Sequence, residues 1–243
     1  MSETGISGNF GSNLAQMLGK KILAVYPDFA YADFVSSVKK QVQDKMYTER
    51  VNILADALQK YLPKEYPKAL QILMNILGEE NQNETGMFKE YYWILPIGKF
   101  VEKYGIDDFA ISMKALEEIT KRNTGEYAIR PFIRKYPKRS LAIMKKWAKS
   151  KNFHLRRLAS EGLRPKLPWA SKLDIFIENP EPVFEILEIL KEDPIKFVQK
   201  SVANHVRDYI KVNSKATEKL VKGWQKTNNP YTLWIIKHAQ RGK

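Results

Sequence analysis

The chain has 243 residues, no cysteine, three widely spaced histidines and a formal net charge of +14. The lack of cysteine excludes disulfides and thiolate metal sites, and the scarce histidines argue against a His-rich metal site, so we expect no metal and no cofactor. Residues 1–12 are polar and glycine-rich, do not resemble a signal peptide and are expected to be flexible. Because no apolar run is long enough to span a membrane, we expect a soluble, cytoplasmic protein, and we take it to be a monomer.

Helical periodicity runs through almost the whole sequence. Apolar residues recur at helical spacing over residues 14–22, 34–42, 51–62 and 70–76, and Pro63 stops the third of these helices. The polar segment 78–86 is predicted to be a loop. Further helices are predicted over residues 92–104, 107–120, 125–135, 139–149, 152–162, 181–191, 194–212, 214–224 and 232–241. No segment alternates as a β-strand does, so the sequence predicts an all-α fold.

Segments in the second half of the chain resemble one another. Residues 158–160 (Leu-Ala-Ser) align with residues 202–204 (Val-Ala-Asn), 44 positions later, and residues 232–241 resemble a third, degenerate copy. Helical hairpins recurring at such a period are typical of HEAT repeats, which stack into a curved solenoid because one hairpin cannot bury its apolar face alone. The sequence therefore predicts a single domain over residues 1–243, built of HEAT-like helical hairpins in a curved α-solenoid.

Positive charge is concentrated in one segment. Residues 121–172 contain 16 Lys and Arg but only two acids, Glu126 and Glu161. A field this concentrated fits a polyanion, of which duplex nucleic acid is the obvious example. An acid inside a phosphate-binding surface weakens binding, so these two are candidates for chemistry. The alternative is that each acid pairs with a neighbouring arginine on an exposed helix, at the i,i+4 spacings 126–130 and 157–161.

A resemblance to a known family rests first on residues 156–170, which read RRLASEGLRPKLPWA. This string resembles the hallmark of the AlkC branch of the DNA alkylation repair enzymes, HEAT-like-repeat DNA glycosylases related to AlkD. Three further stretches fit the same family: GEYAIRPFIRKYP from Gly125, SVANHVRDYIK from Ser201 and LPIGKFVEKYGIDDF from Leu95. The N-terminal third fits more weakly, so the resemblance covers nearly the whole chain.

The sequence departs from the family pattern in two places. The family typically has Asn where Arg207 stands, and its chains usually continue past the helix of His238, whereas this sequence stops at Lys243. We therefore expect a short last repeat. The immunoglobulin-like extension of some members is not in this sequence.

The resemblance implies a DNA glycosylase that removes cationic alkylated bases in base excision repair: 3-methyladenine, and also 3-methylcytosine or 1-methyladenine. A cationic base is already a good leaving group, so the enzyme need stabilise only the oxocarbenium-like sugar, which a carboxylate beside C1′ does. Glu126, Glu161 and Asp208 match the family positions that line the catalytic cleft. The π face of Trp169 could meet the cationic base or sugar, although a core tryptophan between two repeats is the alternative. The resemblance also implies that the base is not flipped out of the duplex.

Arginines and lysines around these residues are the candidate DNA contacts. Arg157 could grip a phosphate near the lesion while it holds Glu161 in place. Further candidates for phosphate contacts are Arg156, Arg164, Lys166, Arg134, Lys138 and Arg207. We expect Trp93, Tyr127, His154 and His205 to be packing residues.

Two other functions are compatible with the sequence. One is a non-catalytic HEAT-repeat protein that binds bent or branched DNA, and the other is a scaffold for an acidic protein partner. Isolated carboxylates in a basic segment favour the glycosylase, because neither alternative needs them.

Overall fold

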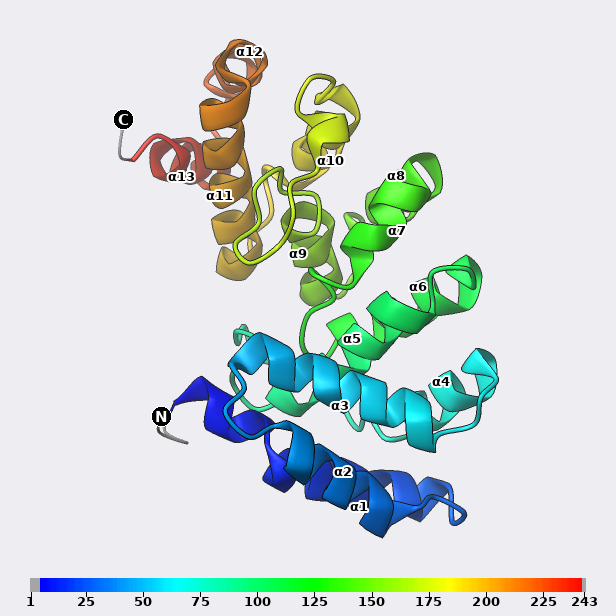
Figure 1. Cartoon of the computed structure of the whole chain (residues 1–243). Coiled ribbons are helices and arrows are strands. Elements are labelled where there is room, and N and C mark those ends of the chain that lie inside the picture. The colour runs from blue at the N-terminus through cyan, green and yellow to red at the C-terminus, as the bar shows by residue number, and fades with distance from the viewer. Residues whose placement is uncertain (1–4, 242–243) are drawn as a thin grey trace. The chain divides into compact units, whose positions relative to one another are not determined.

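The structure is a computed structural model that describes residues 5–241. Within this range the chain forms α-helices and short 3-10 helices and no β-strand, so the predicted all-α fold is confirmed (Figure 1). The helices group into two compact units, which we call unit 1 (up to Ala128) and unit 2 (from Ile129). Unit 2 holds the positive charge: residues 129–243 contain 26 Lys and Arg against 10 Asp and Glu, and residues 1–128 contain 15 against 17.

Unit 1 consists of helical pairs. Its elements are η1 (Ile6–Phe10), α1 (Ser12–Val25), α2 (Tyr31–Gln41), α3 (Tyr47–Tyr61), α4 (Tyr66–Asn75), η2 (Tyr92–Ile94), α5 (Leu95–Tyr104) and α6 (Phe109–Thr120). The apolar stripe of α1 is buried through Leu14, Leu18 and Ile22, and it packs on α2. Such pairing buries the one apolar face that each amphipathic helix has.

The start of unit 1 differs from the flexible segment that we predicted over residues 1–12. Residues 1–4 lie outside the described part, but Ile6–Phe10 form a 3-10 helix whose Phe10 is fully buried. The Phe10 ring packs edge-on against Tyr47 and Tyr92, at centroid distances of 5.1 and 5.7 Å. One aromatic side chain in a polar stretch is enough to attach this segment to the core.

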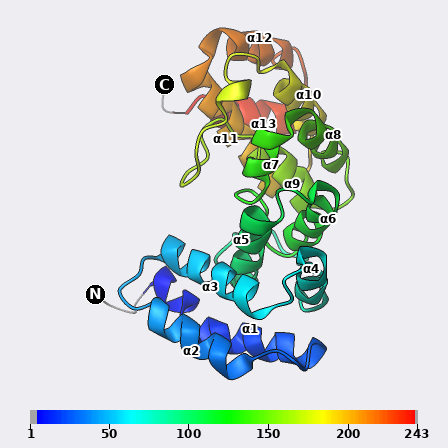
Figure 2. The ribbon, with the colours of Figure 1, turned by 45° about the vertical axis from the view of Figure 1, so that its right-hand side comes forward.

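Unit 2 repeats a helical pattern along the chain (Figure 1, Figure 2). Its elements are α7 (Ile129–Lys135), α8 (Pro137–Trp147), α9 (Phe153–Glu161), η3 (Asp174–Phe176), α10 (Glu181–Leu190), α11 (Lys196–Val212), α12 (Ser214–Trp224) and α13 (Pro230–Ala239). Helix α11 packs between α9 and α13, the three helices that carry the repeated motif. Ala159 of α9 and Ala203 of α11 are buried, which lets these helices approach closely.

Two helix starts in the basic segment differ from prediction. The helix expected over 125–135 begins only at Ile129, because the Thr124 hydroxyl accepts the Glu126 N–H at 3.2 Å and stabilises a turn instead. The next helix begins at Pro137, two residues earlier than expected, since proline suits the first helical position. Helix α9 starts where Asn152 caps the N–H groups of His154 and Leu155.

Candidate active site

The candidate site of unit 2 is built on α9 and α11, which pack against each other. Glu161 is the last residue of α9 and is 5% exposed. One of its carboxylate oxygens accepts a hydrogen bond from Arg164 Nη1 at 2.7 Å, and the other accepts one from the Ser201 hydroxyl of α11 at 2.6 Å. Arg157 Nη2 lies 3.8 Å from the first oxygen. The predicted pairing of Arg157 with Glu161 is therefore present, but it is buried rather than exposed.

Arg164 connects Glu161 to a second acid. Its Nε donates to Asp208 Oδ2 at 2.7 Å, so one guanidinium bridges carboxylates from α9 and α11. The side chains of Arg164 and Asp208 are 11% and 13% exposed. The structure thus brings together two of the three predicted catalytic acids.

The two acids of this network differ in acidity. Burial raises the pKa of Glu161, but the charges of Arg157 and Arg164 and the hydrogen bonds from Ser201 and Arg164 together outweigh it, so the net shift is downward. For Asp208 burial prevails over the bond from Arg164, and the charge of Glu161 adds to it, so the pKa of Asp208 is raised. Glu161 therefore holds its negative charge more firmly than Asp208, which takes up a proton more readily.

His205 lies beneath the network and is completely buried. Its Nδ1 is 3.4 Å from the Ser160 hydroxyl, and its ring stacks on the ring of Tyr209 with 5.4 Å between the ring centroids. Burial and the charge of Arg164 lower the pKa of His205 to about 3, so the imidazole is neutral. His205 is a packing residue, as predicted, and so is the buried His154.

Trp169 lies in the loop between α9 and η3 and is 75% exposed. The alternative of a core tryptophan is therefore wrong. The backbone φ of Trp169 is +59°, a left-handed conformation that is unfavourable for a bulky side chain. An exposed aromatic residue in a strained conformation suggests a functional role.

Two arginines of α7 hold the loop that carries Trp169. The buried Arg130 donates to the carbonyls of Gly162 at 3.1 Å and Arg164 at 2.9 Å, where the loop begins, and to the Ser171 carbonyl near its end. Arg134 also bonds the Ser171 carbonyl, at 3.0 Å. The loop is therefore closed at its base, and this closure positions Trp169.

Glu126 belongs to unit 1, in the turn after α6, and is 3% exposed. The Thr124 hydroxyl donates to its carboxylate at 2.9 Å. Asn123 donates to two carbonyls of the loop 87–91, both at 2.9 Å, and so places that loop against the turn. Burial and the charge of Glu126 raise the pKa of Tyr47 to about 12. Glu126 is thus a buried acid among polar and aromatic groups. Two aromatic residues of unit 1 were predicted to be packing residues: Trp93 is buried in the core, and Tyr127 is half-buried.

Three of the predicted phosphate contacts lie on the surface. Lys138 and Lys166 are exposed. Arg134 is also exposed, but its guanidinium is attached to the loop that it holds. Arg157 is half-buried, with its guanidinium 4.6 Å over the ring of Phe197.

The other predicted contacts are engaged within the protein. Arg156 donates to both carboxylate oxygens of Asp193, and Arg207 donates to the carbonyl of His238 on α13. Arg164 is held between its two acids. Since each guanidinium already has strong acceptors, these arginines are better suited to shaping the surface than to gripping phosphate.

Sequence reasoning did not single out Ser201 or the role of Arg130. Ser201 opens a stretch that carries the family resemblance, but nothing in its type predicts a bond to a distant carboxylate. The sequence involves Arg130 only in the alternative interpretation of Glu126, as its ion-pair partner at i,i+4 spacing. A loop with prolines at 165 and 168 offers carbonyls but few N–H groups, and that shortage could have indicated a need for an arginine donor.

Comparison with known proteins agrees with the resemblance seen in the sequence. Residues 99–239, more than half of the chain, match the family model described as DNA alkylation repair enzyme. The chain belongs to this family. One relative, YhaZ of Bacillus subtilis (strain 168), is 35% identical over 233 residues, which are 96% of this chain and 62% of YhaZ.

A solved structure of the family extends the comparison to the fold. The alkylpurine DNA glycosylase AlkC of Pseudomonas fluorescens, bound to DNA containing an abasic-site analogue, is 33% identical with a TM-score of 0.87. The match covers 99% of this chain and 65% of AlkC, so the chain spans less than two thirds of the length of both relatives. The helical-repeat fold predicted from the sequence is thereby confirmed.

Residues 5–241 contain no helix long and apolar enough to cross a membrane. The same residues hold no group of three or more His, Asp or Glu placed to bind a metal ion.

Proposed function

We propose that the chain is a DNA glycosylase that hydrolyses the N-glycosidic bond of cationic alkylated bases in duplex DNA. The proposed lesions are 3-methyladenine first, and 3-methylcytosine or 1-methyladenine in addition. One observation carries the proposal: unit 2, which bears the positive charge, holds the buried carboxylate of Glu161 on α9 and the half-buried carboxylate of Asp208 on α11, bridged by Arg164. The likeness to a DNA-bound alkylpurine glycosylase over 99% of the chain supports it.

The network suits stabilisation of a cationic sugar. Glu161 is held by Arg157, Arg164 and Ser201, so its charge is fixed in position and needs no rearrangement when the glycosidic bond breaks. Asp208 is the more exposed of the two acids and accepts a proton more readily, which fits orientation or deprotonation of the attacking water. We include Glu126 as a third acid of the reaction, on the strength of the family motif.

Trp169 supplies an aromatic face to the proposed site. A cationic base or sugar over its ring gains roughly 0.5–2 kcal/mol. Because the ring is exposed and not enclosed, it suits an open binding surface, in keeping with excision of the base without flipping. We further propose that the protein is a monomer that acts on DNA in the cytoplasm. Lys138, Lys166 and Arg157 are the proposed phosphate contacts.

The deciding experiment separates binding from base release. We expect Glu161→Gln to bind methylated duplex DNA at least as well as the wild type, because one repulsive charge is lost from a positive surface. Single-turnover release of 3-methyladenine at saturating protein should slow by about a hundred- to a thousandfold. The thermal stability of the variant should also fall, since two arginines lose their buried partner, so rates are compared below its unfolding temperature.

Two further variants make the result specific. Glu185→Gln, an exposed acid of unit 2 paired with Lys145, changes the net charge equally and should leave release unchanged. Arg157→Ala should reduce both binding and rate, because it removes a phosphate contact and loosens Glu161. If Glu161→Gln releases base as fast as the wild type once bound, Glu161 is only a structural partner of its arginines.

A non-catalytic protein for bent or branched DNA is the second candidate. The observation that favours it is that both oxygens of Glu161 are already engaged by protein groups. Such a protein would bind methylated and unmethylated duplexes and release no base from either.

A further inference from the structure

The ring of Phe197 lies beside the candidate site, on the face of α11 that packs against α9. Phe197 stands four residues before Ser201, whose hydroxyl donates to the Glu161 carboxylate at 2.6 Å. Because four residues make about one helical turn, Phe197 and Ser201 share a face of α11. On α9, Arg157 stands one turn before Glu161 in the same way. Arg157 and Phe197 therefore meet one turn away from the contact between Glu161 and Ser201.

The guanidinium of Arg157 lies over the ring of Phe197. Its central carbon is 4.6 Å from the ring centroid, a distance at which the negative π face attracts a cation. Nη2 of the same guanidinium lies 3.8 Å from the Glu161 carboxylate. Arg157 is thus attracted both by a ring of α11 and by an acid of α9. A guanidinium on a long side chain loses less freedom on binding a phosphate when it is already held in this way.

Phe197 is itself held by two rings of α9. The ring of Phe153 meets it edge-on with 6.5 Å between the centroids, and the ring of His154 meets it edge-on at 5.8 Å. His154 is buried, and Phe153 and Phe197 are half-buried. Such edge-on contacts fix the orientation of an aromatic ring. The ring of Phe197 therefore gives the guanidinium of Arg157 a fixed support.

The next pair of packed helices shows a similar contact between a cation and a ring. Nζ of Lys196 on α11 lies 3.7 Å from the ring centroid of Trp234 on α13. The same Nζ donates to the side-chain oxygen of Gln199 at 2.7 Å. The oxygen beside this cation belongs to a neutral amide, whereas the oxygen beside Arg157 belongs to the Glu161 carboxylate. Trp234 is therefore a matched control for Phe197.

We propose that Phe197 is a positioning residue for Arg157, whose guanidinium it holds beside Glu161 and ready for a DNA phosphate. The inference rests on the proposed function for the role of Arg157 as a phosphate contact, but not on base release. Loss of the ring leaves the guanidinium charged but freer to move, so ordering it on the DNA costs more. Glu161 keeps its bonds from Arg164 and Ser201, so the reaction of bound DNA should change little.

The experiment is a double-mutant cycle of Phe197→Leu and Arg157→Ala. Leucine keeps an apolar side chain at position 197 and removes the π face. Affinity for an unmodified duplex is measured by fluorescence anisotropy at low salt, below the unfolding temperature of every variant. Phe197→Leu should weaken binding by roughly two- to tenfold when Arg157 is present and by less than about 1.5-fold in the Arg157→Ala protein. Phe197→Tyr keeps the ring and should bind within about twofold of the wild type.

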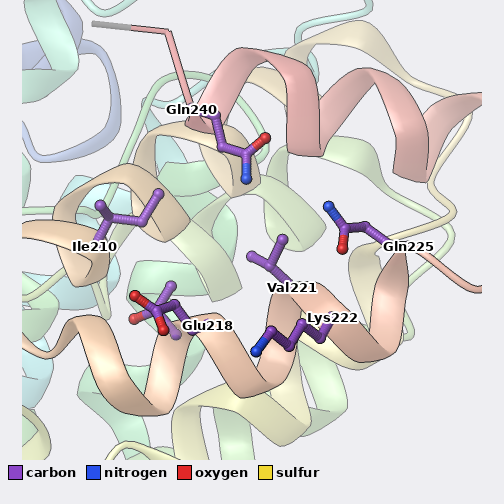
Figure 3. A pocket seen from close by; sticks show the side chains of 7 residues that line it. Ile210, Glu218, Val221, Lys222, Gln225 and Gln240 are labelled. Carbon is purple, nitrogen blue, oxygen red and sulfur yellow. The ribbon is translucent and has the colours of Figure 1, made fainter. Parts of the chain in front are cut away.

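Two controls separate this coupling from net charge and from the loss of a ring. Lys222 is an exposed lysine on the wall of a hollow of about 190 Å³ among α11, α12 and the end of α13 (Figure 3). Lys222→Ala removes one positive charge, as Arg157→Ala does, and Phe197→Leu should keep its full effect in that protein. Trp234→Leu removes the ring beneath Lys196, so its effect on binding should not depend on Arg157.

Equal effects of Phe197→Leu with and without Arg157 would overturn the proposal, because Phe197 would then act through packing alone. Binding by Phe197→Tyr as weak as that of Phe197→Leu would overturn it too. At saturating protein, Phe197→Leu should release 3-methyladenine within about threefold of the wild-type rate, since weaker binding leaves the bound complex intact. A wild type that binds the duplex but releases no base rejects only the glycosylase, because the coupling is measured by binding. A wild type that binds no duplex rejects both.

Discussion

At the scale of single residues, two substitutions of Trp169 separate the contribution of its ring from the cost of its left-handed backbone conformation. A non-glycine residue in the left-handed region costs about 1–2 kcal/mol, and glycine escapes that cost. Because the ring is exposed, its loss removes little packing. We therefore expect Trp169→Gly to be more stable than Trp169→Ala by about 1 kcal/mol in urea unfolding.

Base release should respond differently to the same pair of variants. If the ring meets the cationic base or sugar, both variants lose it, and both should release 3-methyladenine about three- to thirtyfold more slowly than the wild type. Equal rates for all three proteins would show that Trp169 does not touch the reacting nucleotide.

At the scale of helices, His205 couples the packing of α9 against α11 to pH. Its pKa is lowered to about 3 in the folded chain, whereas in the unfolded chain it titrates near its ordinary value of about 6.5. Below about pH 6.5 the unfolded state therefore binds more protons, so stability falls as pH falls. The loss approaches about 1.4 kcal/mol per pH unit.

The variant His205→Phe keeps an aromatic ring against Tyr209 and cannot take up a proton. The free energy of unfolding in urea is measured from pH 8 to pH 5. Its slope against pH should be shallower for the variant than for the wild type, by an amount that corresponds to about one bound proton. At pH 8 His205 is neutral in both the folded and the unfolded state, so the difference in unfolding free energy between the two proteins there measures packing alone. A slope unchanged by the substitution would mean that His205 is protonated in the folded protein.

At the scale of the whole molecule, the charge difference between the units predicts how binding depends on salt. Lys138 and Lys166 are exposed lysines of unit 2. Their joint replacement by glutamate should weaken binding to all duplex sequences alike. The salt slope should become shallower by about 2, because each phosphate that a lysine neutralises accounts for about 0.9 of it. Arg134 is unsuitable for this test, because its replacement would also loosen the Trp169 loop.

The measurement is duplex affinity between about 50 and 200 mM salt, with duplexes of different sequence. A flat salt dependence of the wild type would point to an acidic protein as the partner instead of DNA. Weakening confined to one duplex sequence would indicate that these lysines contact bases.

Local information determined the helical fold. Apolar residues at helical spacing, with proline and glycine between the segments, identify amphipathic helices whose single buried face must meet another helix. For this reason α1 and α11 lie close to their predicted limits. The exceptions depend on single side chains, as in the turn that Thr124 stabilises and the short helix that Phe10 attaches to the core.

The candidate acids could also be chosen from the sequence, because two carboxylates in a strongly basic segment are conspicuous and a family motif surrounds Glu161. Their environments depended on tertiary structure. Asp208 meets Arg164 from 44 residues away, and Ser201 meets Glu161 from 40 residues away, contacts that arise only when α11 packs on α9. Sequence spacing reveals neighbours within one helix, since it follows the helical period, whereas partners on different helices are set by packing. The same limit explains why Arg164, Arg156 and Arg207 resembled phosphate contacts in the sequence and bond to the protein in the structure.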